Sequence, residues 1–230
     1  ALEETGVASE DVKSILHGTT IATNSLLQRR GARTALITTE GFRDVLEIGR
    51  QIRPSLFDWR AEKPPALAPR RRRFELHERV LADGSVMVEP SNEDYEEVVD
   101  KTLASKPEAV AVSLLFSFLN PAHEERLLEE LHKRQPDLSV SLSSRVLPEY
   151  REFERTSTPV ANAFTTPVLT SYSAKLGEAL GKRGLAAQLR LLQSNGGATV
   201  HGASPLSRAS LPASAISDDV MRAAIVPSAR

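Results

Sequence analysis

The sequence predicts an α/β protein with a parallel sheet, because strand-like and helix-like segments alternate along the chain. The clearest stretch holds a helical segment at 92–105, an apolar strand at 109–118, a helical segment at 121–134 and a strand at 138–143. A strand, a helix and a second strand in this order are typical of a βαβ unit. Apolar residues make up 40% and charged residues 26% of the chain, as in ordinary folded domains.

The N-terminal part continues this alternation. Residues 14–17 form a short predicted strand, and Thr19 or Thr20 is a suitable N-cap for a helix that runs to Arg30. Gly31 stands where a helix-terminating glycine is expected. The elements expected next are a strand at 34–39, a short helix at 43–48 and an irregular, proline-rich loop at 51–69.

Turn residues and prolines punctuate the rest of the chain. Asp83-Gly84 predicts a β-hairpin between residues 74–80 and 86–88. Pro148 is placed to open a helix that Pro159 limits, with a kink before a second helix to about Leu180. A strand is expected at 189–193, and the Ser/Ala/Pro-rich residues 204–230 are expected to form a poorly packed tail.

Charge and cysteine content exclude several classes of protein. Lys and Arg total 29 against 30 for Asp and Glu, so the net charge of -1 provides no general attraction for nucleic acid or membrane. The basic run 70–73 is therefore interpreted as a solvated loop or a subunit contact. The chain has no cysteine, which excludes disulfides and thiolate chemistry and fits a cytoplasmic protein. No apolar run approaches the roughly 20 residues that cross a bilayer.

Two turns rich in glycine and hydroxyl groups follow predicted strands. The first is His17-Gly18-Thr19-Thr20 and the second is Ser194-Asn195-Gly196-Gly197. Turns of this kind can direct backbone N–H groups and hydroxyls at a phosphate. The alternative is that each glycine only permits a tight turn. His123 and His132 do not form a metal pair, because nine residues of helix put them on opposite faces.

Five segments in order resemble the hydantoinase/oxoprolinase family, which includes N-methylhydantoinase, 5-oxoprolinase and ketone carboxylase subunits such as that of acetone carboxylase. The segments are 17–24 (HGTTIATN), 38–50 (TTEGFRDVLEIGR), 120–124 (NPAHE), 147–157 (LPEYREFERTS) and 193–197 (QSNGG). The resemblance covers about residues 1–203. It implies an actin/sugar-kinase-like, or ribonuclease H-like, ATPase fold with a β-hairpin insertion. It also implies use of ATP with Mg2+ to phosphorylate an amide, lactam or ketone oxygen.

The resemblance assigns roles to particular residues. It implies His17 and Arg155 as catalytic, although a structural role for His17 is the other interpretation. It implies substrate or nucleotide binding by Gly18, Thr19, Thr20, Asn24, Arg50, Arg151, Ser194, Asn195, Gly196 and Gly197. Helix capping explains at least one of the two threonines without any function. It implies no metal ligand among these side chains, and a second hydantoinase-type subunit or domain as partner.

Two departures from the family pattern shape the functional expectation. The chain starts after the family's acidic, glycine-rich first strand, and after Gly197 it lacks the second glycine-rich turn of that pattern. We therefore expect a fragment of an ATP-dependent cyclic-amide hydrolase that is inactive alone. The alternatives are a ketone carboxylase subunit and a non-catalytic ATPase-like module.

Overall fold

A four-stranded parallel sheet forms the centre of the computed structural model, which describes residues 11–52, 55, 57–185, 187–192 and 198–200. The strand order is β3-β2-β6-β7, and every neighbouring pair is parallel. The strands are β2 (Thr34–Thr39), β3 (Arg73–Leu76), β6 (Ala109–Ser113) and β7 (Ser139–Leu142). This arrangement confirms the predicted α/β class and parallel sheet.

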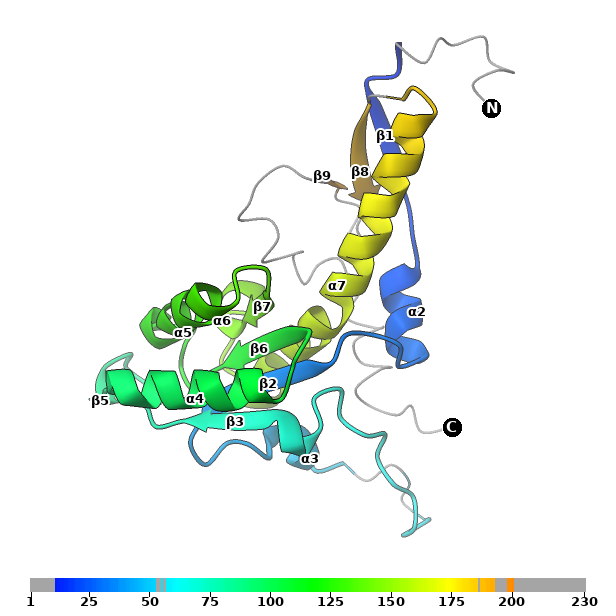
Figure 1. Ribbon diagram of the computed structural model, residues 1–230. Coiled ribbons are helices and arrows are strands. Elements are labelled where there is room, and N and C mark those ends of the chain that lie inside the picture. Colours follow the sequence, from blue (N-terminus) through cyan, green and yellow to red (C-terminus); the bar gives the residue numbers. More distant parts are fainter. Residues whose placement is uncertain (1–10, 53–54, 56, 186, 193–197, 201–230) are drawn as a thin grey trace.

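Helices cover both faces of this sheet (Figure 1). α4 (Asn92–Ala104) and α5 (Ala122–Arg134) pack on one face, and α7 (Glu152–Lys182) packs on the other. Along β6 the side chains alternate between the two cores: Val110 and Val112 face α4 and α5, whereas Ala109 and Ala111 face α7. Because both faces are covered, β2 and β6 are buried throughout, and neither strand contains a charged residue.

The strand β6 is shorter than the sequence predicts. The apolar run continues to Phe118, but the strand ends at Ser113. The Leu114 N–H donates to a side-chain oxygen of Glu124 at 3.0 Å and so leaves the ladder. Phe116 then takes a left-handed conformation with φ of 52°, which turns the chain back towards α5. The apolar residues at 114–118 therefore do not belong to the strand. They are apolar because they are buried or half-buried in the turn that follows it.

The predicted hairpin exists, but it is smaller than expected. β4 (Arg79–Val80) and β5 (Val86–Val88) are antiparallel, and Gly84 between them has φ of +83°. The Asp83 carboxylate accepts the Ser85 N–H at 2.9 Å, which fixes the turn. Residues 74–76, which the sequence assigns to the hairpin, belong to β3 and pair with β2.

The helix α7 runs without interruption through two prolines, where the sequence predicts a break and a kink at Pro159. It begins at Glu152, after Arg151 as N-cap, and Pro148 lies outside it. Pro159 has no N–H for the carbonyl of Arg155. That carbonyl instead accepts the hydroxyl of Ser113 at 3.5 Å, so a neighbouring strand compensates for the proline. Within the described residues, no helix has the length and apolarity that a membrane crossing requires.

The N-terminal helix also ends earlier than predicted. α2 (Ile21–Leu27) has Gln28 as its C-cap, so neither Arg30 nor Gly31 belongs to its end. Gly31 has a different role, because a Cβ there would lie 2.3 Å from the ring of Phe164 on α7. The next residue, Ala32, donates its N–H to the Phe164 carbonyl at 2.9 Å. Close approach to α7, and not helix capping, explains this glycine.

A second, smaller sheet lies beside the C-terminal half of α7 (Figure 1). β1 (Ser14–His17) pairs in parallel with β8 (Gln188–Leu192), and β9 (Ala198–Val200) pairs antiparallel to β8. The remaining elements are α3 (Val45–Ile48), α6 (Ser143–Val146) and the 3-10 helix η2 (Arg70–Arg72). Loop residues 51–69 form no helix or strand where they are described. The predicted tail at 204–230 lies outside the described residues.

The close contact at Gly31 yields a stability prediction. Gly31→Ala should destabilise the protein by about 1–3 kcal/mol, because the Phe164 ring and carbonyl leave no room for a methyl group. Gly177→Ala is the matched control, since it lies inside α7 with nothing within 4 Å of the added Cβ. The control should stabilise the helix by about 0.5–1 kcal/mol. Urea denaturation of both variants measures the difference, and equal effects would contradict the close contact.

Candidate functional site

The two predicted glycine and hydroxyl turns follow neighbouring parallel strands. The register of β1 and β8 pairs His17 with Leu191, so the two strands end at the same level. A Cβ on Gly18 would lie 3.7 Å from Leu192 Cδ1, which places the exit of β1 against the exit of β8. The second turn, Ser194, Asn195, Gly196 and Gly197, lies outside the described residues. In open α/β sheets, ligands bind at the carboxyl ends of strands.

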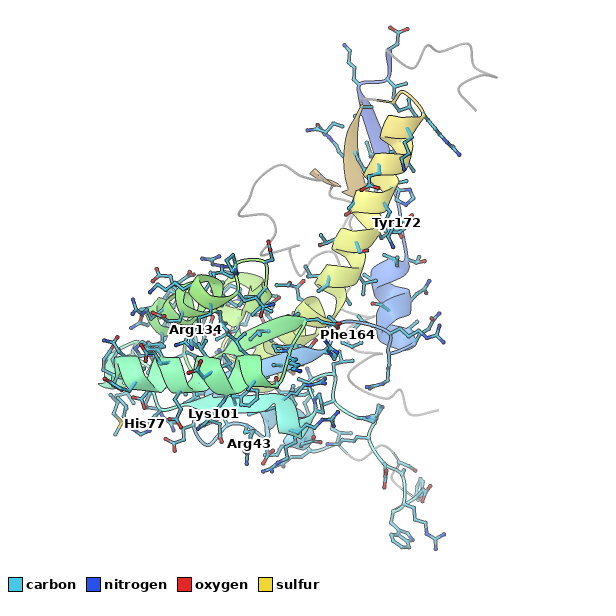
Figure 2. All side chains as sticks on the ribbon, in the orientation of Figure 1. Arg43, His77, Lys101, Arg134, Phe164 and Tyr172 are labelled. Atoms are coloured by element: carbon cyan, nitrogen blue, oxygen red, sulfur yellow. The ribbon has the colours of Figure 1, made fainter. Side chains whose placement is uncertain are left out.

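His17 is held at this edge by α7. Its Nε2 lies 2.8 Å from the Tyr172 hydroxyl, and the ring centroids are 5.7 Å apart. Figure 2 shows Tyr172 on α7, at the level where β1 passes the helix. Among the described residues, Nδ1 of His17 has no hydrogen-bond partner. The half-buried imidazole therefore has one nitrogen fixed by the protein and one available for a ligand.

The polar residues after Gly18 divide into two roles. The Thr19 hydroxyl accepts the N–H of Ile21 at 3.3 Å, so it serves the start of α2. Thr20 is the N-cap residue, but its side chain makes no capping hydrogen bond. It accepts the side-chain amide of Asn24 at 3.3 Å instead, and both residues are exposed. The capping explanation thus applies to Thr19, and Thr20 with Asn24 remains accessible.

Arg50 and Arg151 come together elsewhere, in an open groove at the start of α7. Arg50 forms an ion pair with Glu154, and Arg151 lies with its guanidinium 5.9 Å from the centre of the Tyr150 ring. A hydrogen bond with Tyr150 raises the pKa of Arg151 above its ordinary value. Other residues that line the groove are Phe42, Val45, Ile48, Gly49, Glu152 and Phe153. One arginine is thus neutralised by a carboxylate, whereas the other is exposed.

Arg155 is buried in a polar network and does not face this groove. Only 1% of its surface is exposed, and burial lowers the pKa of its guanidinium. Its Nη1 donates to the Leu114 carbonyl and to the hydroxyls of Ser117 at 2.9 Å and Ser143 at 3.1 Å. Ser143 in turn donates to the buried carboxylate of Glu124 at 2.6 Å. In this structure Arg155 joins α7 to the ends of β6 and β7.

The two residues expected to be catalytic are therefore far apart. Tyr172, which holds His17, follows Arg155 on the same helix by 17 residues. At a rise of 1.5 Å per residue this is about 25 Å along α7. His17 groups with Thr20 and Asn24, Arg50 groups with Arg151, and Arg155 belongs to neither group. A catalytic role for Arg155 stays a prediction that its position in the described residues does not support.

Sequence reasoning missed a second buried network, around His123. Its Nδ1 lies 3.0 Å from Glu78 and its Nε2 lies 3.3 Å from Glu89. Because both nitrogens face carboxylate oxygens, both must donate, which requires the imidazolium form. The hydrogen bond to Glu78 is the main cause that raises the pKa of His123. The signal in the sequence was its spacing from Leu127 and Leu131, which puts it on the buried side of α5.

The His123 network makes stability depend on pH. The folded-state pKa of His123 is raised above its ordinary value of 6.5, so the protonated form stabilises the fold. This stabilisation is complete below pH 6.5 and is lost as pH rises through the higher folded-state pKa. Wild-type protein should thus lose more stability than His123→Gln over that interval. Urea unfolding of both proteins at a series of pH values tests this, and parallel curves would contradict it.

Comparison with known proteins relates this architecture to a family. Residues 1–134 match the sequence profile of the hydantoinase/oxoprolinase N-terminal region. Caprolactamase subunit alpha of Pseudomonas jessenii is 33% identical over 81% of this chain. 5-oxoprolinase 1 of Arabidopsis thaliana is 34% identical over 83%, and the gamma subunit of acetophenone carboxylase of Aromatoleum aromaticum is 31% identical over 84%.

A solved structure agrees with these sequence matches. The crystal structure of ATP-dependent caprolactamase from Pseudomonas jessenii superposes with a TM-score of 0.74 at 32% identity, over 86% of this chain and 29% of that one. The chain spans 27% of caprolactamase subunit alpha, 16% of 5-oxoprolinase 1 and 28% of the acetophenone carboxylase subunit, so it is less than a third of each relative. The profile match and the shared α/β architecture lead to one conclusion: the chain belongs to the hydantoinase/oxoprolinase family.

Proposed function

We propose that this chain supplies the N-terminal region of an ATP-dependent enzyme that hydrolyses a cyclic amide. The observation that carries the proposal is the parallel pairing of β1 and β8, which sets the first glycine and hydroxyl turn against Leu192 at the end of β8. Two of the relatives are named for the lactams they open, and one is named as ATP-dependent. An actin/sugar-kinase-like ATPase fold is part of the same proposal, as is a cytoplasmic location.

The residues at this edge suit a phosphorylated or carbonyl ligand. Backbone N–H groups of the Gly18 turn and the exposed Thr20 hydroxyl are donors for phosphate oxygens. His17, oriented by Tyr172, can donate from Nδ1 to a carbonyl oxygen or phosphate. The described residues contain no group of three His, Asp or Glu side chains that could hold a metal. When bound, Mg2+ would keep several waters and contact the phosphate oxygens of ATP.

The proposed reaction uses these groups for positioning. When bound, Mg-ATP supplies a phosphoryl group to the ring carbonyl oxygen, which makes the amide carbon a better target for water. The net reaction converts the lactam, ATP and two waters to the open amino acid, ADP and phosphate. Gly18, Thr20 and His17 would fix the reacting oxygens at the edge of the sheet, which is the main contribution of a protein to phosphoryl transfer. A second subunit would complete the enzyme, since two of the relatives are named as subunits.

A ketone carboxylase subunit is the second candidate. The observation that favours it is the 31% identity to the acetophenone carboxylase gamma subunit over 84% of the chain. Phosphorylation of a ketone oxygen would then trap an enol for carboxylation. The two candidates share the site at β1 and β8 and differ in the substrate, so the choice of substrate in the assay distinguishes them.

The role proposed for His17 is testable in the complete enzyme with its partner subunit. ADP release coupled to ring opening is measured with 5-oxoproline, caprolactam and hydantoin, and ketone carboxylation is measured in parallel. His17→Ala should lower kcat/KM by about 100-fold, because it removes a positioned hydrogen-bond donor. Lys133→Ala is the control and should change little, since Lys133 is exposed and forms a surface ion pair with Glu130 on α5.

Three outcomes would count against the proposal. Carboxylation of a ketone without ring opening would replace it by the second candidate. Absence of both reactions in the complete enzyme would favour a non-catalytic module. Full activity of His17→Ala with either substrate class would show that the site lies elsewhere.

A further inference from the structure

A pocket with an apolar wall and a basic rim lies between α3, the loop segment 63–67 and the first turns of α7. We call it the α3–α7 pocket. Its apolar wall is formed by Leu46, Ile52, Leu67, Phe153 and Val160, and its cations are Arg29, Arg50 and Lys63. Val160 belongs to the core between the large sheet and α7, and Leu46 and Leu67 pack against this core. This part of the apolar wall is therefore continuous with the core.

In the part of the chain that the structure describes, no carboxylate neutralises two of the three cations. Lys63 donates to the carbonyls of Ile48 at 3.0 Å and Glu47 at 3.4 Å, and Arg29 donates to the carbonyl of Pro65. These partners carry no formal charge. Among the described residues, neither Lys63 nor Arg29 forms an ion pair. The rim therefore carries positive charge that is held in place by backbone oxygens.

The other charges at the pocket are already compensated. Arg50 forms an ion pair with Glu154, and the carboxylate of Glu47 accepts from the buried Arg73 at 2.7 Å. Glu47 is the acidic residue in the pocket lining, so the lining offers no free carboxylate to Lys63 or Arg29. A ligand that carries a negative charge would therefore be attracted to these two cations without competition from a carboxylate of the lining.

The shape of the pocket decides which anion fits. The pocket is small and partly open, with a cavity volume of about 80 Å3, which suits a compact ligand. Inorganic phosphate would satisfy the cations and leave the apolar wall in contact with water. A neutral hydrocarbon would fill the wall and gain no attraction from the two exposed cations. An anion with a short apolar body satisfies both surfaces.

We propose that the α3–α7 pocket is a binding site for a small aliphatic monocarboxylate. The carboxylate lies between Lys63 and Arg29, and the aliphatic part lies against Leu67, Phe153 and Val160. The backbone at Gly49 lines the pocket, where a Cβ would lie 3.8 Å from Lys63 Nζ and 3.6 Å from the Phe153 ring. The site is separate from the one proposed at β1, because Phe153 precedes Tyr172 by 19 residues, about 30 Å along α7.

Isothermal titration calorimetry of the full chain with 3-methylbutanoate tests the proposal. We expect one site of millimolar affinity, as suits so small a ligand. The uncharged 3-methylbutanamide has the same shape and should bind at least about tenfold more weakly, because it supplies no charge. Inorganic phosphate should also bind more weakly, because it gains nothing from the apolar wall. Neither ATP nor turnover is needed, so the result is independent of the proposed function.

Charge-removing variants localise the site. The double variant of Lys63→Gln and Arg29→Gln should weaken 3-methylbutanoate binding by at least about tenfold. Lys101→Gln is the control and should bind normally, because Lys101 lies on α4, on the far side of the large sheet (Figure 2). Lys63 and Arg29 are exposed, so we expect the double variant to fold.

Several results would overturn the proposal. These are absence of binding, equal binding of the acid and the amide, equal binding of phosphate, and unchanged affinity in the double variant. If the double variant does not fold, the comparison of acid, amide and phosphate on the unaltered chain still decides the question.

Discussion

The buried guanidinium of Arg155 is the interaction on which most of the described structure depends. A charged group inside a protein is costly unless hydrogen bonds and a nearby opposite charge compensate it. Nη1 of Arg155 donates to the Leu114 carbonyl and two serine hydroxyls, whereas its buried Nε has no hydrogen-bond partner among the described residues. Ser143 in turn donates to the carboxylate of Glu124. The ends of β6 and β7 and the start of α5 are thereby fixed to one turn of α7.

The position of α7 in turn determines where the smaller sheet and its candidate site lie. Its first half packs on the large sheet, and Tyr172 in its second half holds His17 at the end of β1. Phe164 between them receives the chain at Gly31 and Ala32. One helix thus connects the buried ionic network to the edge at which ligands are proposed to bind, and a shift of α7 would move both.

Local chemistry predicted much of the fold. The pattern of apolar and polar residues predicted the bounds of β2, α4 and α5 to within one residue. Asp83-Gly84 predicted the position of the hairpin, because the geometry of a turn depends on adjacent residues. The predicted break at Pro159 was wrong because Ser113, 46 residues away, satisfies the carbonyl that the proline leaves free. Gly31 was misinterpreted for the same reason, since its neighbour Phe164 is distant in sequence. Such compensation is tertiary and leaves no local pattern.

The candidate site was predictable only in part. The turn after His17 follows a strand, which the local pattern shows, and the structure places it at the expected edge. The family resemblance named both His17 and Arg155 as catalytic. A resemblance of this kind identifies residues in the sequence, but it does not show which side chains lie close together in the fold. The burial of Arg155 depends on serines from two other segments. The inward position of His123 and Glu124 was visible in the helical spacing from Leu127, but no ligand chemistry followed from it.

The pairing of β1 with β8 has a consequence for how the protein is made. It joins Ser14 to Gln188, a separation of 174 residues, so it is among the least local contacts in the chain. The large sheet can assemble from residues 34–142 while the ribosome still holds the partner of β1. At about 5–20 residues per second, β1 remains without that partner for roughly 10–35 s during translation. Throughout this time its backbone edge is open to other chains, which makes this strand a natural place for a chaperone to bind.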